Sequence, residues 1–493
     1  MREIRIIDTT LRDAHQCLWA TRMTTAMMLG IADKMDRIGF ESFDLLGGSG
    51  FDVCVRYLKE NPWERIGLMR ENAPRTKLQG GMRSKGLISF DQLPDDINFL
   101  WLECLAKRGI RRVRTLDALC DYDNQGDNLR KAKELGMEAV GSVVFSISPV
   151  HTDAFYAAKT RELVVRANID VMKLKDQGGL LTPDRIRTLV PAMLKMLPAG
   201  VPLSLHSHCI TGLAPLVYIE GVKLGVSQIE TSIAPLANGQ AQPATQTMVR
   251  NLRSLGYTLN VNDTLIDEVS AYFARIAENE GLPVGVPAEY DEFHYQHQIP
   301  GGMLANFKFQ LSQAGLSHFL PAVLEECGRI RAELGWPVMV TPFSQFVGVQ
   351  AMLNVVQGER YKTVPDELKK YALGYYGQLV APVQPDILDI IVARGSSKIA
   401  LTPAPREPAV AALRKQYPNL SDEERLLRYC YKGSQVDEML AGGPMKTVYT
   451  FDQPVVQLIR ELAKRRLPGR VFIEKGALRL DLGGTPQGAA AAT

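Results

Sequence analysis

The sequence predicts an α/β protein, a parallel (β/α)8 TIM barrel followed by a mostly helical C-terminal region. In the first half of the 493 residues, short apolar or β-branched runs alternate with longer amphipathic stretches. This alternation is typical of repeated β–α units. After about residue 260 it stops, and helical patterns punctuated by Gly and Pro follow.

Each strand is expected where apolar and β-branched residues form a run of about four to eight residues. The eight expected strands are 4–10, 42–46, 77–82, 112–116, 139–145, 171–175, 203–208 and 228–233. Eight such units over about 250 residues describe a closed barrel better than an open doubly wound sheet.

Helices are expected where apolar residues recur at helical spacing. Between the strands these stretches are 24–38, 95–108, 126–135, 153–167, 183–197 and 214–224. In the C-terminal region they are 265–280, 317–334, 344–356, 366–372 and 385–394.

Changes in composition divide the chain into four expected units. Residues 1–262 form the barrel, and residues 263–400 form a helical region that closes the barrel mouth. A charged, Pro-bearing stretch then introduces a small helical domain at 401–468. The last unit, 469–493, is a short hairpin with a flexible Gly/Ala-rich tail.

Composition excludes several classes of protein. The chain has 57 Lys and Arg against 54 Asp and Glu, and this net charge of +3 gives no electrostatic footprint for nucleic acid. Its seven cysteines are scattered and form no C-x-x-C pair, which is typical of a reduced protein. No run approaches the ~18 uncharged apolar residues of a membrane span. We therefore expect a cytoplasmic protein.

Candidate catalytic residues follow from the barrel, because active sites of this fold lie at the carboxyl ends of the strands. Polar residues follow five different expected strands: Asp13 with Gln16, Arg83, Asp117, Lys175 with Asp176, and His206 with His208. Structural burial of an arginine or a histidine explains one or two of these positions. It explains the whole set poorly.

His206 and His208 lie two residues apart on a strand, so both rings face one side and can share a cation. The same spacing is equally common on packed faces without metal. Asp13 adds a carboxylate at a neighbouring strand end, and this set suits Zn²⁺, Mn²⁺ or Co²⁺. Lys175 either joins as an anionic carbamate or pairs with Asp13 or Asp176, and chemistry alone favours the ion pair.

Two further features are given structural interpretations. Cys209 lies beside His208, but no second base is identifiable, so we expect a packing role. His294 and His297 form an H-x-x-H pair without neighbouring ligands. We expect these two rings to make surface or interdomain hydrogen bonds.

Several motifs, in order along the chain, resemble the biotin-dependent carboxyltransferase family. This family includes the carboxyltransferase domain of pyruvate carboxylase, the oxaloacetate decarboxylase alpha subunit and the transcarboxylase 5S subunit. The motifs lie at 8–23, 47–48, 51–54, 61–65, 148–152, 175–183, 298–303, 341–345 and 374–377.

The resemblance implies a divalent metal held by Asp13, a carbamylated Lys175, His206 and His208. It also implies that Gln16 and Arg83 contact the acceptor. Arg83 offers a planar fork for a carboxylate and Gln16 can orient a carbonyl. We further expect Asp117 to help bind the acceptor, whereas the structural alternative pairs Arg83 with Asp117 or Asp44.

The sequence departs from this family at the acceptor pocket. Members that use pyruvate or oxaloacetate carry a proton-shuttling threonine in a G-T-S-Q-P run, where this chain has Gln240 in Gly239–Pro243. We place Gln240 among the catalytic positions, although an amide is a poor proton relay. Gln177-Gly178 and Gly80-Gly81 also replace apolar residues of the family. The acceptor is therefore not pyruvate, or the proton takes another route, or the activity is weakened.

The resemblance predicts a carboxyltransferase subunit that moves a carboxyl group between carboxybiotin and a small acceptor, such as the 2-oxo acids pyruvate and oxaloacetate. The sequence has no Ala-Met-Lys-Met biotin site and no phosphate loop of a biotin carboxylase. A biotin carboxyl carrier protein and a biotin carboxylase subunit must then be partners, and we expect a homodimer within a larger complex.

Three alternatives remain open from the sequence. The first is a transcarboxylase or decarboxylase that acts on a different acceptor. The second is a metal-dependent aldolase or acyl-CoA lyase of related barrel fold. The third is a non-catalytic scaffold in a carboxylase complex.

Overall fold

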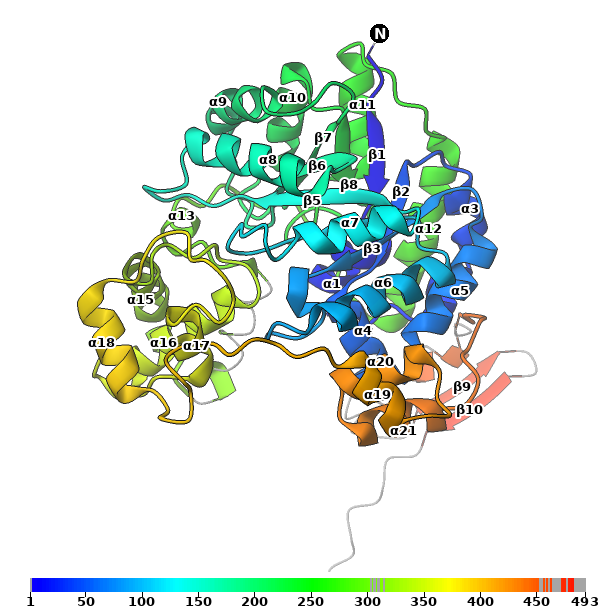
Figure 1. Ribbon diagram of the computed structural model, residues 1–493. Helices are drawn as coiled ribbons and strands as arrows, with labels where there is room; N and C mark the ends of the chain where they lie inside the picture. Colours follow the sequence, from blue (N-terminus) through cyan, green and yellow to red (C-terminus); the bar gives the residue numbers. More distant parts are fainter. Residues whose placement is uncertain are drawn as a thin grey trace, which may run out of the picture.

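The computed structural model describes residues 2–301 and 315–451, the strands 471–475 and 478–482, and a few residues at 304–313 and 455–462 (Figure 1). The expected hairpin turn at 476–477 and the Gly/Ala-rich tail at 483–493 lie outside the described residues.

The predicted TIM barrel is confirmed. Eight parallel strands follow one another in chain order, and β8 pairs with β1 to close the barrel, with Ile6 opposite Ile229. The strands are β1 (Arg5–Asp8), β2 (Ser42–Leu46), β3 (Lys77–Met82), β4 (Arg112–Thr115), β5 (Glu138–Val144), β6 (Val171–Asp176), β7 (Leu203–Ser207) and β8 (Gln228–Thr231). Each lies within its expected range or extends it by one residue.

Helices surround the strands (Figure 1). They are α2 (Thr25–Leu29), α3 (Ala32–Asp36), α5 (Pro62–Asn72), α6 (Asp95–Arg108), α7 (Gly126–Glu134), α8 (Asp153–Ala167), α9 (Pro183–Leu194), α10 (Ala214–Leu224), α11 (Thr245–Ser254) and α12 (Asp263–Glu280). Side-chain caps begin several of them. Thr152 accepts from the Phe155 N–H, and Thr182 accepts from the Arg185 N–H.

The single helix expected at 24–38 is wrong, because two short helices, α2 and α3, replace it. The break lies at Gly30, where a Cβ would come within 2.3 Å of the Tyr272 hydroxyl. That hydroxyl, on α12, donates to the Met27 carbonyl at 2.9 Å. The interruption therefore depends on a residue far along the chain.

The predicted helical C-terminal region is also confirmed. It contains α13 (His294–His297), a 3₁₀ turn (Ser317–Phe319), α15 (Leu320–Glu333), α16 (Phe343–Gln357), α17 (Asp366–Ala372) and α18 (Pro385–Arg394). Its apolar cluster includes Phe343 and Phe346 and extends to Leu116 and Leu119 after β4. The region therefore packs on the carboxyl end of the barrel, whereas α12 packs on the barrel wall against α3 and α11.

Three more helices, α19 (Val410–Gln416), α20 (Asp422–Cys430) and α21 (Gly433–Ala441), pack beside α6 and the turn at Cys54–Leu58. Arg108 of α6 makes two short hydrogen bonds to Glu423 of α20, the longer at 2.6 Å. The strands β9 (Val471–Lys475) and β10 (Leu478–Leu482) form an antiparallel pair.

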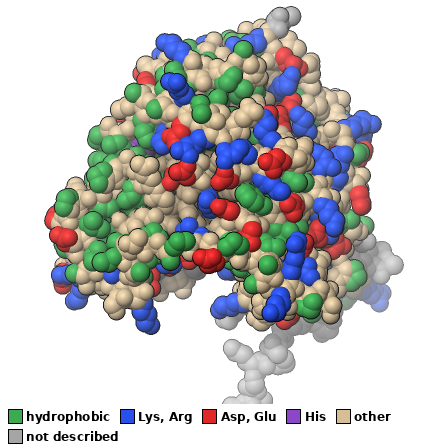
Figure 2. All heavy atoms as spheres, viewed as in Figure 1, with side chains coloured by type: hydrophobic (Ala, Val, Ile, Leu, Met, Phe, Trp, Pro, Cys, Tyr) green, Lys and Arg blue, Asp and Glu red, His purple; other side chains and the backbone are tan. Residues whose placement is uncertain are grey.

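Charges of both signs are interspersed on the face drawn in Figure 2. Among the described residues, none of the helices is both long enough and apolar enough to cross a membrane.

Candidate active site

A cavity of about 470 Å³ opens at the carboxyl end of the barrel. Loops that follow several strands line it, together with Pro300–Gly301 and residues 340–345 of the helical region. Six of the predicted site residues are in its wall: Asp13, Gln16, Arg83, Lys175, His208 and Gln240. His206 and Asp117 are not. The volume is that of a typical small-molecule site.

The predicted metal ligands converge at one end of this cavity. Asp13 Oδ2 lies 3.3 Å from His206 Nε2 and 3.4 Å from His208 Nε2, and the two Nε2 atoms are 3.0 Å apart. Lys175 Nζ is 3.1 Å from His206 Nε2 and 3.9 Å from Asp13 Oδ2. His206 thus lies directly beside the cavity wall, although it does not form part of it.

The outer nitrogens of both histidines have their own acceptors. His206 Nδ1 lies 2.6 Å from a Glu230 carboxylate oxygen, and His208 Nδ1 lies 2.6 Å from the Gln240 carbonyl. Each Nδ1 can therefore donate, which leaves the Nε2 lone pairs directed at one another and at Asp13. Two lone pairs and a carboxylate facing one point are a chemically suitable set for a divalent cation.

The environment shifts the pKa values of all four predicted ligands, and the shifts of Asp13 and Lys175 bear on the carbamate. Burial alone would raise the pKa of Asp13, but the charges of Arg12 and Lys175 hold it well below its usual range. Burial lowers the pKa of the Lys175 amine to about 8, against the opposing attraction of Asp13. A neutral amine is the form that reacts with CO₂ to give a carbamate, so the site favours that modification more than an exposed lysine would.

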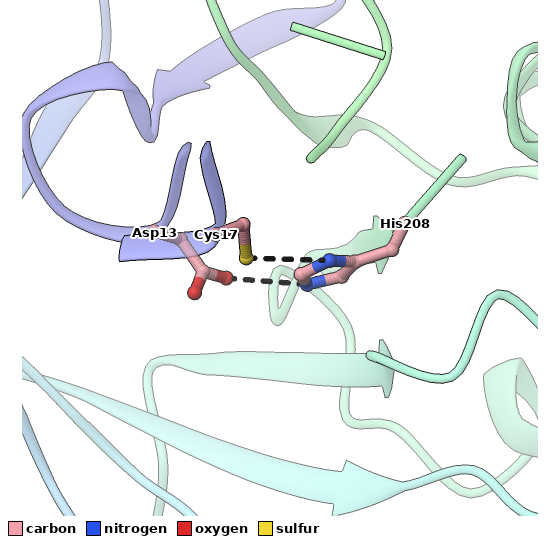
Figure 3. A group of neighbouring side chains, drawn as sticks. All are labelled: Asp13, Cys17 and His208. Atoms are coloured by element: carbon pink, nitrogen blue, oxygen red, sulfur yellow. Dashed lines mark hydrogen bonds and ion pairs between the residues drawn. The ribbon is translucent and has the colours of Figure 1, made fainter. Parts of the chain in front are cut away.

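Cys17 is a site residue that the sequence analysis did not identify. Its Sγ lies 3.9 Å from His208 Nδ1, and Asp13 faces Nε2 of the same ring (Figure 3). Asp13, Cys17 and His208 form a group that could hold a metal ion. The available signal was spacing, since Cys17 follows Asp13 by four residues and so lies on the same side of a helical turn.

Gln242 was also missed, and its amide lies among the predicted ligands. Its Nε2 donates to Asp13 Oδ2 at 3.1 Å and lies 3.0 Å from His208 Nε2. Its Oε1 accepts from the hydroxyls of Thr9 and Ser232 at 2.9 and 3.0 Å. Those bonds fix the amide so that its NH₂ end faces the ligand atoms. Its place two residues after Gln240 was the only sequence signal.

Glu230 and Lys173 form a buried ion pair beneath the site. Glu230 also accepts from His206, so Lys173 is linked to a predicted metal ligand through one carboxylate. Burial alone would raise the pKa of Glu230, but Lys173 and His206 hold it well below its usual range. Lys173 precedes Lys175 by two residues, and this spacing places both on one face of β6.

Arg83 lines the cavity as predicted, but its structural partner differs from the expected one. It donates to the Ile88 carbonyl and its guanidinium lies 5.4 Å from the Phe90 ring centre. The alternative that Arg83 pairs with Asp44 is wrong, because Asp44 accepts from Arg114 Nε at 3.1 Å. Arg83 therefore adds a positive charge to the cavity wall.

Asp117 lies outside the main cavity and organises its own turn. It accepts from the backbone N–H groups of Leu119 and Asp121 at 2.8 and 3.1 Å, and from the Asn124 amide at 3.1 Å. Burial raises its pKa to about 6. Asp117 is thus absent from the wall of the main cavity, although it lines a smaller pocket of about 40 Å³ together with Arg83.

Cys209, His294 and His297, for which we expected structural roles, are all buried. Cys209 is 2% exposed, and burial raises its thiol pKa to about 12. His294 lies 2.7 Å from the Gly178 carbonyl, and His297 accepts from the Ile299 N–H. Of the two expected alternatives, surface or interdomain hydrogen bonding, the surface position is wrong, and the bond from His294 in the helical region to Gly178 of the barrel fits the interdomain alternative.

Comparisons with known proteins agree with this geometry. The family "Conserved carboxylase domain" matches residues 295–441, and "HMGL-like" matches residues 120–272. A pyruvate carboxylase subunit of Methanocaldococcus jannaschii is 38% identical over 81% of this chain and 70% of its own length. The methylmalonyl-CoA carboxyltransferase 5S subunit of Propionibacterium freudenreichii is 31% identical over 80% of this chain and 78% of its own length.

The 2-oxoglutarate carboxylase large subunit of Hydrogenobacter thermophilus is 33% identical over 80% of this chain and 60% of its own length. Among solved structures, the carboxyl transferase domain of Rhizobium etli pyruvate carboxylase with oxamate and biotin has a TM-score of 0.81 and 26% identity. The match covers 90% of this chain and 79% of that one.

The barrel, the geometry of its cavity and the similarity to known carboxylases together define a TIM-barrel enzyme that transfers carboxyl groups. The chain belongs to the biotin-dependent carboxyltransferase family, whose members include the pyruvate carboxylase relative and the transcarboxylase 5S relative described above. Membership implies biotin-dependent catalysis with a metal.

Proposed function

We propose that this carboxyltransferase moves a carboxyl group between carboxybiotin on a separate carrier and a small 2-oxo acid. The observation that supports this most strongly is the convergence of Asp13, Lys175, His206 and His208 at the end of a cavity that also holds Gln16 and Arg83. Carboxyl transfer needs a place where an enolate forms away from water, and this cavity offers positive groups around such a place.

The metal in this proposal is Zn²⁺, Mn²⁺ or Co²⁺, held by Asp13, His206, His208 and a carbamylated Lys175. Two imidazoles and oxygen donors suit these ions. When bound, the cation supplies Lewis-acid stabilisation of the charge that develops on the enolate. The Nδ1 hydrogen bonds of both histidines would direct the Nε2 atoms toward the position it occupies.

The acceptor is oriented by the chain's own polar groups. Arg83 binds its carboxylate through the planar guanidinium, and Gln16 donates to its carbonyl. In the forward direction the N–C bond of carboxybiotin breaks and the acceptor carbon forms a new bond to the carboxyl group. The proton that this carbon loses passes to the biotin nitrogen. The reverse direction decarboxylates the product.

Gln240 gives the acceptor pocket its particular shape. Its side chain packs over Gly301, where a Cβ would come within 2.9 Å of both Cγ and Cδ. The amide has no acid or base form near neutral pH, so we assign it to shaping and hydrogen bonding the acceptor. A proton relay through this position is not part of the proposal.

The partners in this proposal are a biotin carboxyl carrier protein and a biotin carboxylase subunit, with a homodimer of this chain at the centre. The relatives from Methanocaldococcus jannaschii and Hydrogenobacter thermophilus are both named as subunits of their enzymes, which implies multi-subunit assemblies. The carrier brings carboxybiotin to the barrel mouth.

The second candidate is an aldolase or lyase, favoured only by the HMGL-like match over residues 120–272. Both candidates are tested by incubating the chain, a divalent metal, a biotinylated carrier loaded with ¹⁴C-carboxyl groups and a panel of 2-oxo acids. We expect label to move to one acceptor only when carrier and metal are both present. Acceptor cleavage or turnover without biotin would favour the lyase and contradict the carboxyltransferase proposal.

A further inference from the structure

Arg114 of β4 lines the cavity, and its position depends on Gly81, which has no side chain. A Cβ built on Gly81, in the neighbouring strand β3, would come within 2.5 Å of Arg114 Cζ and 2.6 Å of its Nη2. Any larger residue at position 81 would therefore displace the guanidinium. Both residues line the same cavity as Asp13, Lys175 and His208.

The hydrogen-bonding capacity of Arg114 is only partly used. Its Nε donates to the Asp44 carboxylate at 3.1–3.2 Å. Its Nη2 is buried and lacks a hydrogen-bond partner within the described part of the chain, although the side chain is only 4% exposed. A buried guanidinium N–H without an acceptor is destabilising, so this position favours an incoming anionic group.

The charge of the cavity wall favours an anion as well. Among the described residues that line the cavity, Asp13 is the one carboxylate and four are cationic: Arg12, Arg83, Arg114 and Lys175. Arg114 is also paired with Asp44, which lies outside the lining. Arg12 is paired with Asp13 at 2.6 Å. Arg83 already has a role in the proposed function, where it binds the acceptor's first carboxylate. Arg12 Nε and Arg114 Nη2 are both buried without an acceptor in the described part of the chain, but Arg12 is held by Asp13, so Arg114 is the better candidate for a second anion.

We propose that Arg114 binds a second carboxylate of the acceptor, so that the enzyme selects a dicarboxylic 2-oxo acid over a monocarboxylic one. Gly81 is the residue that gives the guanidinium its place. The planar fork of an arginine suits a carboxylate, and the low exposure of the site strengthens the bond. This inference rests on the proposed carboxyltransferase function and identifies its substrate class.

Isothermal titration calorimetry on the full chain, saturated with Mn²⁺, compares 2-oxoglutarate with 2-oxopentanoate, which has the same carbon chain but only one carboxylate. We expect 2-oxoglutarate to bind about 10- to 100-fold more tightly, the usual effect of a hydrogen bond to a charged group. Equal affinities, or tighter binding of 2-oxopentanoate, would overturn the inference.

The titration needs no carrier, so its outcome is separate from turnover. A chain that prefers 2-oxoglutarate but transfers no carboxyl group to any acceptor would contradict the proposed function and still support the inferred selectivity. A chain that carboxylates pyruvate and shows no preference for the dicarboxylate would support the proposed function and overturn the inferred selectivity.

Two variants, Gly81→Ala and Arg114→Lys, test whether Arg114 causes the selectivity. Gly81→Ala should reduce the affinity ratio of the two acids to within about threefold. Gly67→Ala on α5 is the matched control, because its Cβ would make only an ordinary 3.5 Å contact with Arg108. If Gly81→Ala lowers the thermal stability severely, Arg114→Lys tests the same bond. A folded Gly81→Ala or Arg114→Lys protein that keeps the full ratio would contradict the assignment.

Discussion

Hydrogen bonds at Nδ1 decide which way the two site histidines face. Glu230 holds His206, and the Gln240 carbonyl holds His208. Because Lys173 keeps Glu230 ionised, His206 has a charged acceptor at Nδ1, and its Nε2 faces Lys175 and Asp13. A carboxylate in this position orients the ring and increases its basicity toward a metal.

Replacing Glu230 by Gln is therefore expected to weaken divalent metal binding about 10- to 100-fold. The neutral amide is a weaker acceptor for His206 and leaves Lys173 without its counter-ion. Zinc affinity can be measured by competition with a chromogenic chelator. Glu220→Gln, which changes an outward-facing carboxylate of α10 paired with Lys223, is the matched control. Unchanged zinc affinity in a folded Glu230→Gln protein would argue against the orienting role.

Asp117 provides a second test at the scale of a residue. Its backbone and Asn124 bonds serve the turn after β4, so Asp117→Asn should leave the acceptor KM within about threefold of the original value. An increase of tenfold or more would restore the predicted role in acceptor binding.

The same variant has a defined pH dependence. Burial raises the folded-state pKa of Asp117 from 3.8 to about 6, so the folded chain holds this proton more tightly than the unfolded chain. Its contribution to stability is present at low pH and is lost as pH rises from about 4 to about 6. The difference in melting temperature between Asp117→Asn and the original chain should therefore shift in favour of the variant over that range. A constant difference would contradict the burial argument.

At the scale of elements, the cavity is completed by a contact between the barrel and the helical region. Gln240 follows β8, and Gly301 begins the segment after α13. Their close approach is possible only because Gly301 has no side chain, which makes this pair a joint determinant of pocket shape.

Gly301→Ala should therefore push the Gln240 side chain into the cavity and lower kcat/KM for the acceptor about tenfold. The melting temperature should change by no more than about 2 °C, because the displaced group is the end of a flexible side chain facing open space. Steady-state kinetics with the carrier in excess measure the effect. Full activity in Gly301→Ala, or an equal loss in the control Gly67→Ala, would mean that the contact does not shape the pocket.

At the scale of the whole molecule, periodicity alone predicted the barrel, since each strand is a local run of apolar and β-branched residues. Contacts between distant parts of the chain determine features that periodicity does not predict. The break at Gly30 depends on Tyr272, which lies more than two hundred positions away in the sequence. Gly30 is a local signal that weakens a helix, but its contact with Tyr272 could not be predicted from residues 24–38 alone.

The site was predictable where chemistry and strand ends coincided, as for Asp13, Lys175 and the two histidines. Gln242, Glu230 and Lys173 were missed because they are ordinary strand or loop residues until the barrel closes. Closure brings Gln242 to Asp13 and Glu230 to His206. Asp117 is the opposite case: it was predicted as a site residue because it follows a strand, but its hydrogen bonds stabilise the turn after β4.

The proposed function depends on a divalent metal centre in the barrel, held by Asp13, carbamylated Lys175, His206 and His208. It is tested most directly by a high-resolution crystal structure of the full chain, grown with bicarbonate and zinc and measured at the zinc absorption edge. We expect one anomalous peak among these four side chains and carbamate density on Lys175. An empty site with an unmodified Lys175 ammonium under those conditions would contradict it.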